Sequence, residues 1–500
     1  MTVLAHRPTA SDANDAVTRD ALAVLQPGFE GTTAPAWLLR QVGEGLTAVG
    51  LFGRNITSPE QLAALTAQLR TERDDVLVAI DEEGGDVTRL EVRGGSSFPG
   101  NLALGAVDDT ALTRDVALEL GRRLAECGVN LNWAPSADVN SNPDNPVIGV
   151  RSFGADTDLT ARHTAAYVEG LQAAGVAACT KHFPGHGDTN VDSHHALPRI
   201  DVDLDTLQAR ELVPFRAAIE AGTKAVMSAH ILVPALDPTR PATLSPQILT
   251  GLLRKELGYE GLIVTDGMEM NAIAGTYGIE RGSVLAIAAG ADAICVGGGL
   301  ADEATVLRLR DALVAAVREG ALPEERLAEA AARVRALAAW TRRAVPDARP
   351  EEGSRASGIG LTAARRALMI TGPVTPLSAP YVATLAPVAN IAVGDETPWG
   401  VAAELGSLLP GTEAGVYPEG ASAGDILAAA GDRTVVAVVR DAHRHPWMTR
   451  ALDALVAARP DTVVVEMGLP RAQPRGALHI ATHGASRVCG RAAAEVIAGA

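Results

Sequence analysis

Hydrophobic positions in the first three hundred residues fall into eight short runs that are rich in strand-forming side chains. The runs span residues 21–29, 46–52, 76–81, 129–137, 177–182, 225–230, 262–266 and 291–296. Segments between them repeat apolar side chains with helical spacing, as at 161–174, 204–221 and 303–318. Because strands that alternate with helices form parallel sheets, eight such repeats predict an α/β protein with an N-terminal (β/α)8 barrel of the TIM type.

A smaller pattern of the same kind follows. Residues 323–343 predict a long helix, and the Pro-rich, charged stretch after it has the composition of a linker. Further strands are predicted at 368–371, 388–393, 434–439, 462–466 and 477–481, with helices at 401–409, 426–430, 447–458 and 492–498. We therefore expect a catalytic barrel domain over 1–344, a linker over 345–360 and a three-layer α/β sandwich over 361–500.

The net charge and the cysteines indicate which partners and which cellular compartment to expect. A net charge of -17 repels nucleic-acid phosphates and anionic membranes, so neither is an expected partner. A local cluster of basic side chains could still accept a small anionic substrate. The first twenty residues lack a secretory pattern, no apolar stretch could span a bilayer, and the four cysteines are scattered among apolar residues. We expect a cytoplasmic protein with reduced thiols.

Polar side chains gather where the predicted barrel strands end. In such barrels the carboxyl ends of the strands form the face that carries catalytic groups. The residues placed there are Asp81, Asp138, Lys181, His182, His230 and Asp266. This agreement of position across several strands predicts one functional site at that face.

The segment 180–198 holds four of the eleven histidines, and Pro184, Gly185 and Gly187 keep its backbone irregular. Three interpretations are open: a solvated loop, a zinc site built from two histidines and two aspartates, or a proton-transfer group. In the last case Asp192 orients His194 and favours its charged form, which suits a general acid/base near neutral pH.

Two carboxylate segments complete the pattern. Asp266 follows a buried apolar strand, where it either caps the next helix or acts as a nucleophile facing the barrel mouth. The turn 80–89 places Asp81 beside two glycines, an arrangement that suits hydrogen bonding to sugar hydroxyls but is common in other proteins too.

Together these segments resemble glycoside hydrolase family 3, in particular its bacterial β-N-acetylglucosaminidases of peptidoglycan recycling in a two-domain form. The most specific match is Lys-His-Phe-Pro-Gly-His-Gly at 181–187, followed by Asp-Ser-His at 192–194. Supporting matches lie at 50–55, 145–154, 227–230 and 241–245, and the resemblance extends to about residue 297.

The resemblance implies a role for each matching residue. Asp266 corresponds to the nucleophile that forms a covalent glycosyl-enzyme intermediate, and His194 to the loop-borne acid/base paired with Asp192. Residues that would hold the sugar are Asp81, Arg89, Arg151, Lys181 and His182, with Met227 and His230 at the pocket floor. No cofactor and no metal are implied.

The implied activity is that of a retaining exo-β-N-acetylglucosaminidase that acts on muropeptides or chitooligosaccharides. One rival is a phosphorylase, in which phosphate instead of water resolves the same intermediate. A second is a metal-dependent hydrolase with ligands drawn from His182, His186, Asp192 and His194. The expected partner is the carbohydrate alone. The oligomeric state is not set by the sequence, although a monomer is favoured.

The sequence departs from the family pattern in the acidic turn. That pattern reads Asp-Gln-Glu-Gly-Gly-Arg, whereas Glu82 and Asp86 stand here for Gln and Arg. Either these side chains face outward, or substrate preference has moved away from anionic muramyl groups. We expect the C-terminal domain to act in packing or in shaping the substrate site, and its polar segment 441–445 to form a solvated loop.

Overall fold

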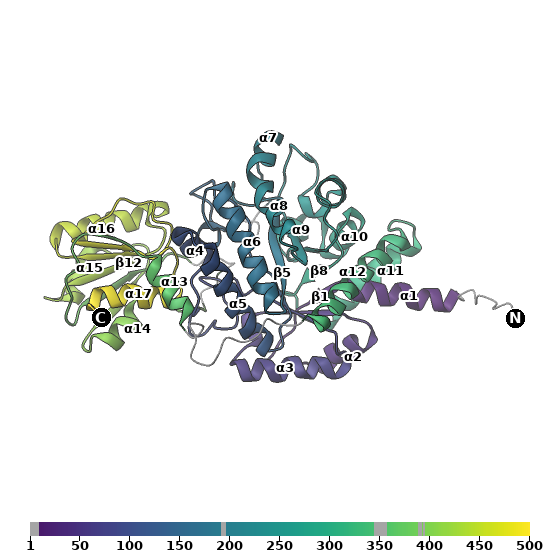
Figure 1. The fold of residues 1–500 in the computed structure, drawn as a ribbon, viewed down its shortest axis with the longest axis horizontal. Coiled ribbons are helices and arrows are strands. Elements are labelled where there is room, and N and C mark those ends of the chain that lie inside the picture. Colours follow the sequence, from purple (N-terminus) through teal and green to yellow (C-terminus); the bar gives the residue numbers. More distant parts are fainter. Residues whose placement is uncertain (1–9, 192–196, 345–357, 389–392, 394–395) are drawn as a thin grey trace.

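The computed structural model describes residues 10–191, 197–344, 358–388, 393 and 396–500. Figure 1 shows two bodies side by side, with the N-terminal barrel on the right and the smaller C-terminal domain on the left. None of the helices in these ranges is both long and apolar enough to cross a lipid bilayer. All four cysteines are buried and free, as expected from their apolar surroundings.

Eight parallel strands form the barrel. Strands β2 to β7 hydrogen-bond in sequence order, β1 pairs with β8, and a bridge from Val264 to Ala293 joins β7 to β8. The strands are β1 (Leu25–Pro27), β2 (Ala48–Leu51), β3 (Leu77–Ile80), β4 (Leu131–Asn132), β5 (Ala177–Phe183), β6 (Ala225–Ser228), β7 (Leu262–Thr265) and β8 (Ile294–Val296). The predicted barrel is therefore confirmed, with one strand in each predicted run.

Helices cover the outside of this ring (Figure 1). The longer ones are α1 (Ala10–Ala23), α2 (Ala36–Glu44), α3 (Pro59–Glu72), α5 (Thr110–Glu126), α6 (Thr157–Ala173), α8 (Leu212–Glu220), α10 (Ile279–Ala289), α11 (Glu303–Arg318) and α12 (Glu324–Arg343). Shorter helices are α4 (Asn101–Val107), α7 (Leu204–Thr206) and α9 (Asn271–Tyr277), and Gln247–Glu256 forms a π-helix. The first predicted run was too long, because residues 21–23 complete α1.

Alternation along each strand separates the barrel interior from its helical coat. Ala177 and Cys179 belong to the cluster inside the ring, whereas Ala178 packs into the cluster beneath the helices. This is the two-residue periodicity of a strand that is buried on both faces. Val334 and Leu337 of α12 join the inner cluster, so this helix packs against the same core.

The C-terminal domain is the predicted three-layer sandwich. Its sheet has the order β11-β10-β12-β13-β14-β9, parallel except for the edge strand β9. Its strands are β9 (Met369–Thr371), β10 (Tyr381–Leu385), β11 (Glu413–Tyr417), β12 (Val435–Val439), β13 (Val463–Glu466) and β14 (Leu478–Ala481). One face packs on α13 (Ile359–Arg366), α14 (Ala402–Leu408) and α17 (Arg487–Ala498), and the other on α15 (Ala423–Ala430) and α16 (Pro446–Ala458).

Two features of this domain differ from the prediction. The strand predicted at 388–393 is wrong at its described ends, since neither Val388, which is 96% exposed, nor Val393 is in a strand. The sheet instead uses β10 and β11. Edge strand β11 is mostly exposed and carries Glu413 and Gly415, so it lacks the apolar run that marks a buried strand. The exact domain limits stay a prediction, because residues 345–357 lie outside the described ranges.

Candidate active site

A cavity of about 630 Å³ lies at the carboxyl ends of the barrel strands. Seven of the predicted residues line it: Asp81, Arg89, Arg151, Lys181, His182, Met227 and Asp266. They come from the ends of β3, β5, β6 and β7 and from the loops after β3 and β4. The predicted acid/base pair, Asp192 and His194, falls outside the described residues.

A buried ion network forms one wall of the cavity. Arg151 donates from Nε and Nη2 to the two carboxylate oxygens of Glu83, at 3.0 and 2.7 Å. The Lys181 ammonium lies 2.7 Å from Glu83 Oε1 and also forms a close ion pair with Asp81. Burial alone would raise the pKa of the Glu83 carboxyl, but the two cations outweigh it and hold that pKa well below its usual range.

Glu83 was missed in the sequence, although a signal for it existed. It lies in the same acidic turn as Asp81, and the two buried cations Lys181 and Arg151 require a carboxylate partner. Of the two network carboxylates, Glu83 is enclosed, with 3% of its side chain exposed, whereas Asp81 is 28% exposed toward the cavity. Asp81 is therefore the carboxylate that remains accessible to a ligand.

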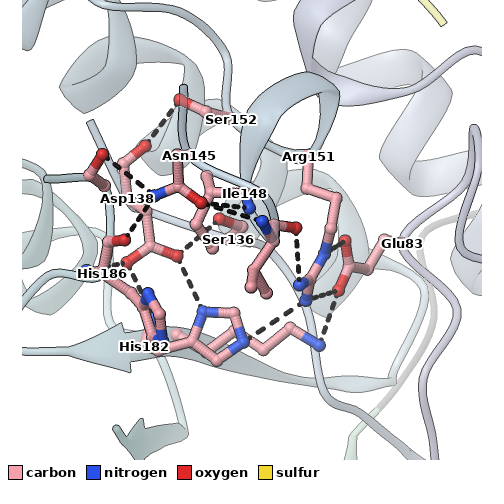
Figure 2. A network of polar contacts seen from close by, with 12 residues as sticks. Glu83, Ser136, Asp138, Asn145, Ile148, Arg151, Ser152, His182 and His186 are labelled. Atoms are coloured by element: carbon pink, nitrogen blue, oxygen red, sulfur yellow. Dashed lines mark hydrogen bonds and ion pairs between the residues drawn. The ribbon is translucent and has the colours of Figure 1, made fainter. Parts of the chain in front are cut away.

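A second network centres on Asp138, a strand-end residue to which no role was assigned from the sequence. Its Oδ2 lies 2.7 Å from His182 Nδ1 and accepts a hydrogen bond from Ser136, while Oδ1 accepts the backbone N–H of His186 at 2.7 Å (Figure 2). Burial would raise the pKa of Asp138, but His182 outweighs it and lowers that pKa. With Nδ1 thus occupied, Nε2 of His182 faces Arg151 at 3.3 Å.

His186 is the unusual member of this group. It is 2% exposed and lines the cavity, and neither ring nitrogen has a partner among the residues that the structure describes. Burial, and then the adjacent His182 ring, lowers the pKa of His186 to about 4. A ring with this pKa is neutral at physiological pH, and both of its nitrogens are enclosed by protein.

Asp266 begins the loop after β7. Its backbone N–H donates to the Ser228 carbonyl of β6 at 3.1 Å, and its Oδ1 accepts from the Gly267 N–H at 2.8 Å. His230 does not line the cavity. Its ring lies behind this loop, with Nε2 3.0 Å from the Gly267 carbonyl and Nδ1 2.8 Å from Thr243 Oγ1. The structure therefore places His230 as a support for the Asp266 loop.

The two acidic departures are both buried, so the first of the two alternatives, outward-facing side chains, is wrong. Glu82 accepts the backbone N–H groups of Arg89 and Leu90, both at 2.8 Å, and burial raises its pKa to about 7. Asp86 forms a close ion pair with Arg440 of the C-terminal domain and accepts the Ala485 N–H at 2.6 Å. Neither acid points into the cavity.

The C-terminal domain reaches the site in two further places. Val393 and Glu396 line the cavity. His443 contacts the Pro143 carbonyl of the barrel at 3.1 Å through Nε2, so the segment 441–445 is an interdomain contact and the expectation of a solvated loop is wrong. Within the described residues, no group of three His, Cys, Asp or Glu side chains is arranged to hold a metal ion.

Comparisons with known proteins agree with this geometry. Residues 34–337 match the model of the glycosyl hydrolase family 3 N-terminal domain. Beta-hexosaminidase A of Pseudoalteromonas piscicida is 38% identical over 312 residues, which are 57% of this chain and only 52% of that protein, about half its length. A beta-hexosaminidase of Neisseria gonorrhoeae is 36% identical over 265 residues, covering 51% of this chain and 73% of that protein.

A solved structure extends the similarity over both domains. The glycoside hydrolase family 3 beta-N-acetylglucosaminidase from Paenibacillus sp. str. FPU-7 superposes with a TM-score of 0.85 at 35% identity, covering 96% of each chain. The family model spans most of the barrel, and the solved relative shares the barrel and the sandwich in the same order. The chain therefore belongs to glycosyl hydrolase family 3.

Proposed function

We propose that the protein is a retaining exo-β-N-acetylglucosaminidase that removes terminal N-acetylglucosamine from muropeptide-type sugars or chitooligosaccharides. The observation that carries this proposal is that Asp266, Lys181 and His182 line the same cavity. The names of the relatives support it, since they are hexosaminidases and a β-N-acetylglucosaminidase.

The ion network suits the recognition of a sugar. Sugar hydroxyls both donate and accept hydrogen bonds, so they are matched by a surface that presents cations and carboxylates together. Arg151 and Lys181 supply donors, and the accessible Asp81 supplies acceptors. Because these charges are already paired and held in place, binding does not need to order them.

The proposed chemistry is a double displacement. Asp266 attacks the anomeric carbon and the bond to the leaving oxygen breaks, while His194, held by Asp192, protonates that oxygen. A water molecule then gives its proton to His194 and attacks the anomeric carbon. The sugar is released and the Asp266 carboxylate is restored. The roles of Asp192 and His194 rest on the resemblance of 181–194 to the family motif.

We further propose that the enzyme works in the cytoplasm, in the recycling of peptidoglycan sugars, and as a monomer. The four buried free thiols support a reducing compartment. The names of the hexosaminidase relatives support a carbohydrate substrate.

Replacing the nucleophile tests the mechanism directly. We expect Asp266→Asn to lower kcat by about 10⁴-fold or more, because the covalent step is lost. In Asp266→Ala, azide should restore turnover and give a glycosyl azide of inverted configuration. Asp205→Asn, at an exposed position of α7, serves as the matched control. Retention of more than a few per cent of activity by Asp266→Asn would remove this residue from the mechanism.

The two rival activities are separated by the assay conditions. We expect release of N-acetylglucosamine at equal rates with and without phosphate, with no sugar 1-phosphate formed. The rate should also survive exhaustive chelation, because the proposed double displacement uses only side chains and water. Phosphate-dependent turnover would identify a phosphorylase, and loss of activity that zinc restores would identify a metal-dependent hydrolase.

A further inference from the structure

Asp86 and Arg440 connect the two domains through an ion pair that is largely buried. Asp86 lies in the loop after β3, and Arg440 directly follows β12 of the sandwich. Their side chains are 2% and 14% exposed, and the Arg440 guanidinium also lies over the Trp399 ring, 5.9 Å from its centre. The Ala485 N–H gives Asp86 a second partner from the C-terminal domain, at 2.6 Å.

Asp86 sits at the tip of a tight turn whose base reaches the sugar-binding network. The Glu83 N–H donates to the Val87 carbonyl at 3.1 Å, and the Val87 N–H donates to the Gly84 carbonyl at 3.3 Å. Gly84 and Gly85 have φ of +77° and +64°, which side chains other than glycine rarely adopt. The turn therefore links Asp86, which the C-terminal domain holds, to Glu83, which pairs with Lys181 and Arg151 of the barrel.

The charges around Asp86 explain why its partner matters. Burial raises the pKa of the Asp86 carboxyl, and the nearby carboxylates of Asp441 and Glu83 act in the same direction. Arg440 is the cation that offsets them. Without it, the Asp86 carboxylate would be buried beside other anions, and movement of the turn toward water would become favourable. Such movement would displace Glu83 as well.

We propose that Arg440 is a positioning residue for the sugar site: by holding Asp86, it fixes the turn 83–87 and thereby the Glu83 carboxylate that orders Lys181 and Arg151. The C-terminal domain thus acts on sugar binding through the barrel's own residues, in addition to lining the cavity. The consequence for turnover rests on the proposed glycosidase function, whereas the coupling of Arg440 to the turn does not.

Kinetics with an aryl N-acetyl-β-glucosaminide test the consequence. We expect Arg440→Met to raise KM between about tenfold and a hundredfold, with a much smaller change in kcat, since small displacements of binding groups have effects of this order. Arg440→Lys, which keeps the charge, should recover most of the loss. The matched control is Arg366→Ala, which removes an exposed interdomain pair with Asp109, a residue outside the turn 83–87, and it should stay within about twofold of wild type.

A double-variant cycle tests whether the two residues act together. If Arg440 works through Asp86, Asp86→Asn combined with Arg440→Met should raise KM no more than Arg440→Met does alone. An unchanged KM in Arg440→Met, or additive effects in the double variant, would overturn the proposal. Should Arg440→Met fail to fold, Asp86→Asn, which removes the same ion pair, should by itself raise KM, and an unchanged KM in that variant would overturn the proposal.

Hydrogen–deuterium exchange provides a readout that does not depend on activity. The amides of Glu83, Gly85 and Val87 are hydrogen-bonded within the turn or to Phe98. We expect Arg440→Met to speed their exchange by at least about tenfold, with no change in Arg366→Ala. Unchanged exchange would overturn the proposal. Faster exchange in a protein that hydrolyses no N-acetylglucosaminide would instead refute the proposed function and leave the coupling intact.

Discussion

Individual side chains at this site are defined by their partners more than by their residue type. Asp81, Glu83 and Asp138 all carry carboxylates near the cavity, yet only Asp81 keeps appreciable exposure toward it. Glu83 and Asp138 are enclosed and serve the cations and imidazoles around them. A buried carboxylate of this kind orders its neighbours, whereas a partly exposed one can still exchange partners with a ligand.

At the residue scale, the buried charge of Glu82 should lower the stability of the folded protein at neutral and higher pH. An ordinary glutamate has a pKa near 4.5, whereas burial raises that of Glu82 to about 7. Between these values the folded chain keeps a proton that the unfolded chain releases, so the stability contributed by this group is full below pH 4.5 and is lost as pH rises to 7. Glu82→Gln, which keeps an acceptor for Arg89 and Leu90, should therefore stabilise the protein by up to about 3 kcal/mol at pH 8.

Urea unfolding at two pH values checks this prediction. The gain in the free energy of unfolding from Glu82→Gln should be present at pH 8 and nearly absent at pH 4.5. Glu325→Gln, at an exposed position of α12, should change little at either pH. A gain that is equal at both pH values would mean that the Glu82 charge is not its cause.

At the scale of elements, the loops after the strands depend on close backbone contacts. A side chain at Gly187 would overlap the Val139 carbonyl oxygen. Asn145 ties the same region by donating from Nδ2 to the carbonyls of His186 and Gly187, at 2.9 and 3.0 Å. Gly187, the last residue of the 181–187 motif, therefore allows the loops that follow β4 and β5 to pack closely, and it precedes in sequence the segment that carries Asp192 and His194.

We expect Gly187→Ala to lower kcat/KM by at least about tenfold and the free energy of unfolding by about 1–3 kcal/mol, because the added methyl must push the two loops apart. The control is Gly406→Ala, a position in α14 with open space for a methyl group, where alanine should be neutral or stabilising. Thermal unfolding and steady-state kinetics on both variants decide the matter. Wild-type kcat/KM and stability in Gly187→Ala would show that the two loops can separate without loss of activity or of folding free energy.

At the scale of the whole molecule, the net charge of -17 opposes the approach of anionic substrates. We expect kcat/KM for a muropeptide disaccharide with a free carboxylate to rise by about two- to fivefold between 20 and 200 mM salt, because salt screens this repulsion. The neutral disaccharide of N-acetylglucosamine should show little change. Equal salt responses, or a fall for the anionic substrate, would mean that the basic residues of the cavity dominate the field.

The sequence by itself determined the class of fold and seven of the residues that line the cavity. Strand periodicity located all eight barrel strands, and residues at strand ends, such as Lys181 and Asp266, were found because the barrel gathers those ends at one face. The same reasoning failed for β11, whose exposed edge position removes the apolar signal.

Only the tertiary structure decided which groups meet. Glu83 and Arg151 are 68 residues apart, and Asp86 and Arg440 are 354 apart, so no local pattern links them. The contact of His230 with the Gly267 carbonyl, across 37 residues, is likewise visible only in the structure. Local periodicity sets which face of an element is buried, whereas pairing between buried charges depends on packing between distant elements, and that information is absent from spacing along the chain.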